Sequence, residues 1–157
     1  MDILNLDPIK NNNYTTKDNS RLLIDKLFLN TRIYFTIKYI HLLLKNRKLA
    51  ILGKYDRKAW TLSSFKVFKL IENCGWKFHI CGINHIRDYK EPVVFISNHM
   101  SAMESMVFPC LIAPFKPVTF VVKKSLTTHF LFGPVMRSIN PVTVGRLNSR
   151  DDLISVI

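Results

Sequence analysis

Three short apolar runs in the second half of the chain limit what it can fold into. None of them contains a charged residue: Val93–Ile96, Val118–Val122 and Val142–Val144. Such runs are typical of strands that are covered on both faces. Two segments with helical spacing lie between consecutive runs, Met103–Ile112 and Phe132–Ile139. This alternation predicts an α/β fold with a largely parallel central sheet flanked by helices.

The middle of the chain adds one further helix and one further strand to this pattern. Thr61–Asn73 has helical spacing, and the Cys74-Gly75 pair that follows it is a typical helix end. Trp76–Gly82 alternates between apolar and polar residues, as a strand with one buried face does. We therefore expect the sheet to begin shortly after residue 75.

The first half of the chain divides into two segments of different composition. Residues 1–20 are polar and aperiodic, which predicts a disordered leader. Residues 21–58 are rich in Leu, Ile, Phe and Tyr with Lys and Arg spread among them, which predicts a basic amphipathic helical segment. Such a helix either lies in a membrane interface with its cations over anionic headgroups, or packs on the rest of the protein.

The chain carries 23 Lys and Arg against 11 Asp and Glu, a formal charge of +12. This excess makes nucleic acid, an anionic membrane surface or a phosphorylated substrate the candidate partners. No nucleic-acid-binding motif is present, and the basic residues are spread through apolar stretches, so we expect a membrane surface and no nucleic acid. No run of 18 apolar residues occurs without a charge and no signal peptide is indicated, so no transmembrane helix is predicted.

The three cysteines predict neither a disulfide framework nor a metal site. Cys74, Cys81 and Cys110 are an odd set without CxxC spacing, which favours a reducing, cytosol-facing environment. His79 and Cys81 share one face of the predicted strand, and this alone does not indicate a metal ligand set. Cys110 lies in an apolar helix, where we expect an inert buried thiol.

Reactive groups gather at the carboxyl ends of strands in α/β sheets, and Ser97–Glu104 directly follows the predicted strand Val93–Ile96. His99 and Glu104 can pair only if His99 lies in a loop and Glu104 in the first turn of the next helix. A histidine held by a carboxylate suits a general base that deprotonates an alcohol. Ser101 and Glu104 also have the spacing of a helix capping box, which is the structural alternative.

These residues resemble the signature of a known family. Asn98-His99 followed by Glu104 is similar to the NHx4(D/E) motif of the glycerophospholipid acyltransferases, which include the lysophosphatidic acid acyltransferases. Lys123–Leu126 and Phe132-Gly133 resemble the family's KKEL and FG stretch, and Asn140–Arg146 resembles its next block. The resemblance covers residues 60–157, which would form the N-terminal portion of an acyltransferase domain.

The resemblance implies a role for each matching residue. His99 would be the general base on the free hydroxyl of a lysophospholipid, and Glu104 would orient it. The acyl group would come from acyl-CoA or acyl-carrier protein as co-substrate, with no further cofactor and no metal. The resemblance implies substrate binding by Arg146, which would hold the acceptor phosphate, and by Lys124, Asn98 and Ser101. Such an enzyme would work peripherally on the cytoplasmic face of a membrane.

The sequence departs from the family pattern at three places. Glu104 replaces the more common Asp, and Ser125 and Phe130 stand where many members have Glu and Pro. The family's later FPEGTR-like block does not occur before Ile157. We therefore expect a C-terminally truncated domain, and a non-catalytic, membrane-associated remnant is the alternative to an active enzyme.

Overall fold

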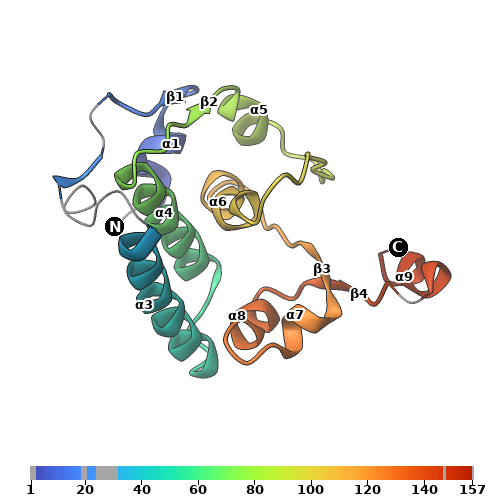
Figure 1. Ribbon diagram of the computed structural model, residues 1–157. Helices are drawn as coiled ribbons and strands as arrows, with labels where there is room; N and C mark the ends of the chain where they lie inside the picture. Colours follow the sequence, from blue (N-terminus) through green and yellow to red (C-terminus); the bar gives the residue numbers. More distant parts are fainter. Residues whose placement is uncertain (1–2, 19–20, 24–31, 147, 157) are drawn as a thin grey trace.

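The computed structural model describes residues 3–18, 21–23, 32–146 and 148–156 (Figure 1). The elements in chain order are η1 Ile3–Asn5, α1 Asp7–Lys10, β1 Tyr14–Thr15, α3 Arg32–Ile51, α4 Arg57–Asn73, β2 His79–Ile80, α5 Ile83–Asp88, α6 Met103–Ile112, β3 Val121–Lys123, α7 Lys124–Thr128, α8 Gly133–Ser138, β4 Val142–Val144 and α9 Ser149–Val156. Helix α4 packs against both α3 and α6, and α7, α8 and the short strands β3 and β4 follow on the side toward the C-terminus.

Helix α4 confirms the predicted helix and begins earlier, at Arg57. Asp56 precedes it and its carboxylate accepts a hydrogen bond of 2.7 Å from the Ala59 N–H, which satisfies one of the free amides of the first turn. At the other end, the Cys74 N–H donates back into the helix, and Gly75 has a φ of +91°. A glycine adopts this left-handed conformation without strain, so the Cys74-Gly75 pair ends the helix as the sequence predicts.

The main core forms between α4 and α6. Phe68 and Cys110 are fully buried there, and Val67, Ile71 and Val107 are nearly so. Helix α6 has the predicted bounds, Met103–Ile112. The predicted inert thiol of Cys110 is also confirmed as buried, and burial raises its pKa to about 12.

A hydroxyl group of α4 repairs the hydrogen-bond ladder of α6 next to Pro109. Proline has no N–H and distorts the helix around it. The Cys110 N–H donates to Ser64 Oγ at 3.0 Å, and the same hydroxyl donates to the carbonyl of Met106 at 2.6 Å. Ser64 therefore bridges a donor and an acceptor of α6 inside the core, where an unpaired backbone group would be costly.

The predicted disordered leader is wrong for the part of residues 1–20 that the structure describes. Leu6 and Ile9 are 0% and 1% exposed and belong to the core around Phe68. Farther along, β1 pairs antiparallel with β2, with Tyr14 opposite Ile80. Two apolar residues three positions apart make one turn of an amphipathic helix, which is too short for the sequence pattern to indicate.

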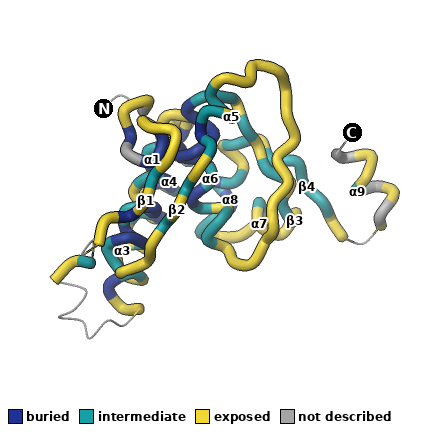
Figure 2. The backbone as a smooth tube through the Cα atoms, turned by 90° about the horizontal axis from the view of Figure 1, so that it is seen from above, coloured by how far each residue is buried: buried dark blue, intermediate teal, exposed yellow. Residues whose placement is uncertain are grey.

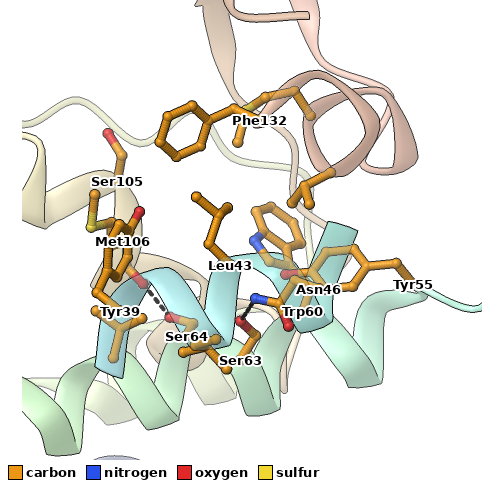
Figure 3. Close-up of a pocket in the computed structure, with 14 residues that line it drawn as sticks. Tyr39, Leu43, Asn46, Tyr55, Trp60, Ser63, Ser64, Ser105, Met106 and Phe132 are labelled. Atoms are coloured by element: carbon orange, nitrogen blue, oxygen red, sulfur yellow. Dashed lines mark hydrogen bonds between the residues drawn. The ribbon is translucent and has the colours of Figure 1, made fainter. Parts of the chain in front are cut away.

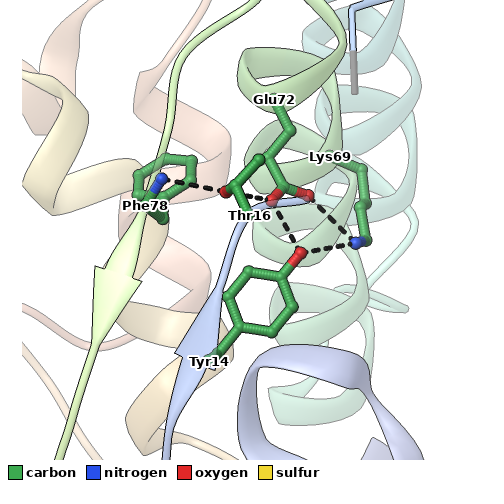
Figure 4. Close-up of polar contacts among 5 residues, drawn as sticks. All are labelled: Tyr14, Thr16, Lys69, Glu72 and Phe78. Carbon is green, nitrogen blue, oxygen red and sulfur yellow. Dashed lines mark hydrogen bonds and ion pairs between the residues drawn. The ribbon is translucent and has the colours of Figure 1, made fainter. Parts of the chain in front are cut away.

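A buried carboxylate ties this N-terminal segment to α4 (Figure 4). Glu72 is 3% exposed and accepts hydrogen bonds from the hydroxyls of Tyr14, at 2.6 Å, and Thr16. Lys69 neutralises it from the previous turn of α4 at 2.9 Å, and Lys69 also donates to the Tyr14 hydroxyl. The Thr16 hydroxyl accepts the Phe78 N–H, so the cluster links β1, the segment before β2 and α4.

Helix α3 accounts for most of the predicted segment 21–58, of which residues 24–31 lie outside the described part. One face packs on the protein through Tyr34, Leu43 and Asn46, and the Asn46 amide donates to Ser63 of α4. Packing is therefore confirmed for that face. Among the described residues, no helix is long and apolar enough to cross a membrane.

The predicted largely parallel central sheet is not present among the described residues. The described strands form two separate pairs, antiparallel β1–β2 and parallel β3–β4, in which Val121 lies opposite Val142. Only β3–β4 has the predicted parallel arrangement, and the strand predicted over Trp76–Gly82 is reduced to β2.

The predicted buried strand Val93–Ile96 is wrong as well. Val94 and Ile96 are 87% and 92% exposed and belong to no strand. Its residues form part of the long exposed segment after α5 in Figure 2. A strand requires a partner for its backbone N–H and C=O groups, and no described strand pairs with this run.

Candidate functional site

The histidine motif lies in the exposed loop that leads into α6. His99 is in the loop, with its side chain 71% exposed, and Glu104 is in the first turn of the helix. His99 Nδ1 lies 3.8 Å from Glu104 Oε2, a separation that allows an ion pair when the imidazole is protonated. This is the arrangement that the spacing of the two residues requires for pairing.

The same carboxylate also caps the helix. Glu104 accepts hydrogen bonds of 3.1 Å from the N–H groups of Met100 and Ser101 and from the Ser101 hydroxyl. The Ser101 hydroxyl in turn accepts the Met103 N–H at 3.0 Å. The two interpretations of the sequence are therefore compatible, because capping holds the Glu104 carboxylate in the position from which it faces His99.

Hydrogen bonding keeps the Glu104 carboxylate charged. The pKa of Glu104 is lowered chiefly by its own backbone N–H, and the Ser101 hydroxyl and the amides of Met100 and Ser101 lower it further. Desolvation opposes these contributions without cancelling them. A carboxylate that remains ionised stabilises a neighbouring imidazolium, which is the charge that His99 would carry after taking up a proton.

Two predicted binding residues follow the two strands of the parallel pair. Lys124 begins α7 directly after β3, and Arg146 comes two residues after β4. Because β3 and β4 are parallel, their carboxyl ends meet at the same edge of the sheet. Both cations are exposed there, so each of the two strands brings positive charge to this edge.

An acidic residue of α9 shapes the backbone at Arg146. Asp152 accepts hydrogen bonds from the N–H groups of Gly145, at 2.6 Å, and Arg146, at 2.8 Å. Arg146 has a φ of +61°, a left-handed conformation that costs free energy for a residue with a Cβ. The sequence does not indicate this contact, because a carboxylate that reaches back across a turn leaves no periodic pattern.

The structure thus brings some of the predicted residues together and leaves others apart. His99, Ser101 and Glu104 form one cluster, and Asn98 precedes it in the exposed loop. Within the described ranges, no hydrogen bond or ion pair connects Lys124 or Arg146 to this cluster. The same part of the chain contains no group of three His, Cys, Asp or Glu side chains that could hold a metal ion.

A pocket of about 90 Å³ lies behind the motif, between α3, α4, α6 and α8 (Figure 3). Ser105 and Met106, which follow Glu104, form part of its wall, and its polar groups are largely paired, as in the bond between Asn46 and Ser63. Burial raises the pKa of Tyr55 in this wall to about 12. The volume is below that of the ~150 Å³ cavity that holds benzene in an engineered protein.

Comparison with known proteins gives one family. A family model described as "Acyltransferase" matches residues 77–156, just over half of the chain. The matched range contains all six predicted site residues, namely Asn98, His99, Ser101, Glu104, Lys124 and Arg146, and begins after α4. No curated protein and no solved structure matches the chain.

Proposed function

The chain belongs to the acyltransferase family, and from this membership we propose that it acylates a lysophospholipid. The acceptor is 1-acylglycerol-3-phosphate or a close relative, and the donor is acyl-CoA or acyl-carrier protein. One observation carries the proposal: exposed His99 in the loop and the carboxylate of Glu104 in the first turn of α6 lie 3.8 Å apart. A hydroxyl acceptor needs a base of this kind before it can attack a thioester.

The pairing leaves the other ring nitrogen of His99 available for the reaction. With Nδ1 facing Glu104, Nε2 takes the proton from the acceptor hydroxyl as its oxygen attacks the thioester carbonyl carbon. The C–O bond of the ester forms and the C–S bond breaks. The leaving sulfur takes the proton from the imidazolium and departs as a thiol, so no acyl-enzyme is formed. Glu104 lowers the free energy of the imidazolium between these two proton transfers.

The cations after β3 and β4 supply the phosphate-binding part of the proposal. Arg146 presents planar paired donors that match a phosphate, and Lys124 adds positive charge at the same edge. Asn98 positions the loop. The Ser101 hydroxyl is occupied by Glu104 and Met103, so we assign it the role of holding the carboxylate in place.

We extend the proposal to peripheral attachment at an anionic, cytoplasmic membrane face through α3. This helix contains no Asp or Glu and five basic residues. Opposite its packed face, four exposed apolar residues follow one another at helical spacing: Ile33, Ile37, Ile40 and Leu44. Apolar side chains that enter the interface, with cations beside them over anionic headgroups, favour this attachment.

The catalytic proposal is tested by incubating the purified chain with lysophosphatidic acid and radiolabelled acyl-CoA. We expect labelled phosphatidic acid from the wild type and a loss of about 10²–10⁴-fold in rate for His99→Ala, the usual contribution of a general base. His85→Ala is the matched control, because His85 is an exposed histidine of α5 within the same family match. Equal background rates in the wild type and His99→Ala would contradict the proposal.

The membrane proposal is tested by flotation with vesicles of phosphatidylcholine and phosphatidylglycerol. Ile37→Glu places a negative charge on the apolar stripe of α3, whereas Thr36→Glu places it beside the stripe on the same helix. We expect Ile37→Glu to release the protein from vesicles at salt concentrations at which Thr36→Glu still floats. Equal flotation of the two variants would show that the stripe does not enter the membrane.

A further inference from the structure

A second hollow runs along the outside of the helix pair α3 and α4, which lie side by side in Figure 1. It measures about 320 Å³, within the usual range of small-molecule sites. Three of its wall residues come from α3 and five from α4: Tyr34, Lys38 and Leu42, and Phe65, Lys66, Lys69, Leu70 and Asn73. We call it the α3–α4 groove.

Three lysines line the α3–α4 groove, and they are in different electrostatic states. Lys69 is neutralised by the buried Glu72 and also bonds to the Tyr14 hydroxyl. Lys38 and Lys66 are exposed, and neither forms a hydrogen bond or an ion pair with any residue that the structure describes. Two lysines whose ammonium groups have no partner among the described residues, one from each helix, therefore line the same groove.

The floor between these ammonium groups is apolar. Tyr34 and Leu70 are buried, and Leu42 and Phe65 are partly buried. A free phosphate ion would gain binding free energy from the cations but none from this apolar floor. A ligand that joins an anionic group to a hydrocarbon chain gains from both, so the chemistry of the groove fits an anionic amphiphile.

We propose that the α3–α4 groove binds one anionic phospholipid of the membrane, with its phosphate between Lys38 and Lys66 and its upper chain on the apolar floor. This inference rests on the proposed membrane attachment. On α3, Tyr34 and Lys38 directly follow the stripe residues Ile33 and Ile37, so the groove borders the surface that would lie on the bilayer. A lipid headgroup in that plane reaches the groove without leaving the membrane.

The position of the groove makes it a site separate from the acyl-transfer cluster. The α4 residues that pack against α6, among them Ser64, Val67 and Phe68, lie on the opposite side of α4 from Lys66 and Leu70. Helix α6 carries Glu104. A lipid in the groove would therefore anchor the protein and leave the His99 loop free for substrate.

The experiment titrates the full chain with short-chain phosphatidylglycerol below its micelle concentration and measures heat by calorimetry. We expect saturable binding, and weak or no binding of phosphatidylcholine with the same chains or of glycerol phosphate, which has no chain. Lys38→Gln/Lys66→Gln should weaken phosphatidylglycerol binding about tenfold or more. Lys45→Gln/Lys58→Gln is the matched control, since it removes the same charge from exposed positions of α3 and α4 outside the groove.

Each other outcome overturns the inference. An equal loss of phosphatidylglycerol affinity in both double variants would indicate diffuse attraction to the basic surface. Equal affinity for glycerol phosphate would indicate a site for phosphate alone. No binding of phosphatidylglycerol would show that the groove is not a lipid site. Circular dichroism checks that both double variants remain folded. Acyl transfer in detergent micelles is measured in parallel, so failure of the groove alone is distinguished from failure of the proposed enzyme activity.

Discussion

The α4–α6 core and the segments that carry the family motifs are held together by different interactions. In the core, Phe68 and Cys110 are fully buried among apolar neighbours. In each motif segment, a helix carboxylate accepts hydrogen bonds from two backbone N–H groups of the preceding loop. Glu104 of α6 binds the N–H groups of Met100 and Ser101, and Asp152 of α9 binds those that follow β4.

This difference separates stability from activity. Apolar packing that is spread over two helices contributes to the free energy of unfolding of the whole unit. A carboxylate that orders an exposed loop affects mainly the local opening of that loop, which needs little free energy. Substitutions in the core should therefore change unfolding, whereas substitutions of the two carboxylates should change the site in a protein that remains folded.

The sharpest form of this comparison uses two phenylalanines. Phe68→Ala removes a fully buried ring that stacks on Phe78, so we expect the free energy of unfolding to fall by about 3–5 kcal/mol. Phe95→Ala removes a ring from the exposed loop and should change it by no more than about 0.5 kcal/mol. Urea denaturation measures both. Similar losses would mean that the loop is packed in solution.

Glu104→Gln separates the two roles of the carboxylate. Glutamine preserves the capping box, so the free energy of unfolding should change little. It removes the negative partner of the imidazolium, and we expect acyl transfer to slow about 10²-fold, equivalent to about 2.7 kcal/mol. Unchanged activity would leave Glu104 with a capping role alone.

The acid sensitivity of the cap follows from the same carboxylate. The pKa of Glu104 is lowered from its usual 4.5 in the folded protein, so its stabilising effect is complete above that pH. The effect is lost as the pH falls through the lowered pKa. Glu104→Ala, which lacks both the cap and the titrating group, should lower the free energy of unfolding at neutral pH and show no such acid step.

The buried cluster at Glu72 predicts the opposite pH dependence. Burial and the bond to Glu72 raise the pKa of Tyr14, and although burial lowers the pKa of Lys69, its bonds to Tyr14 and Glu72 raise it overall. Both groups keep their protons in the folded state at a pH where the unfolded chain loses them. Stability should therefore be constant up to about pH 10 and fall above it.

Tyr14→Phe tests this cluster directly. The substitution removes a hydrogen bond to a charged group, so we expect a loss of about 1.5 kcal/mol at neutral pH. Because the titrating phenol is also gone, the decline above pH 10 should be shallower than in the wild type. An identical decline in urea-unfolding curves would mean that Tyr14 does not contribute to it.

Local pattern was enough to predict the helices and part of the site. Helix α6 has the predicted bounds because its apolar spacing and its capping residues are both local, although the bridge from Ser64 that accommodates Pro109 is not. The loop position of His99 and the helical position of Glu104 follow from the same helix boundary. Features that depend on one helix start were therefore predictable.

Features that depend on partners distant in the sequence could not be predicted. The run Val93–Ile96 has the composition of a buried strand, but composition does not supply a neighbouring strand, and the run is exposed. Leu6 and Ile9 were assigned to a disordered leader, although the core of α4 and α6 receives them. The hydrogen bond from the Arg146 N–H to the Asp152 carboxylate also joins two separate segments, and no sequence pattern indicates it.

That contact gives the smallest expected change in stability and the most specific test of the motif segments. Asp152→Ala leaves the N–H groups of Gly145 and Arg146 to water, so unfolding should change by no more than about 1 kcal/mol, while exchange of these two amides with solvent becomes faster. If Arg146 binds the acceptor phosphate, its looser backbone raises KM for lysophosphatidic acid more than it lowers kcat.

Two further variants control this test. Asp152→Asn keeps one acceptor, so its KM and amide exchange should lie between those of the wild type and Asp152→Ala. Asp88→Ala, at an exposed position of α5, should change neither KM nor exchange of these amides. A lower kcat at constant KM would instead place Asp152 with the reacting groups, and the edge of β3 and β4 would then not be a site that only binds phosphate.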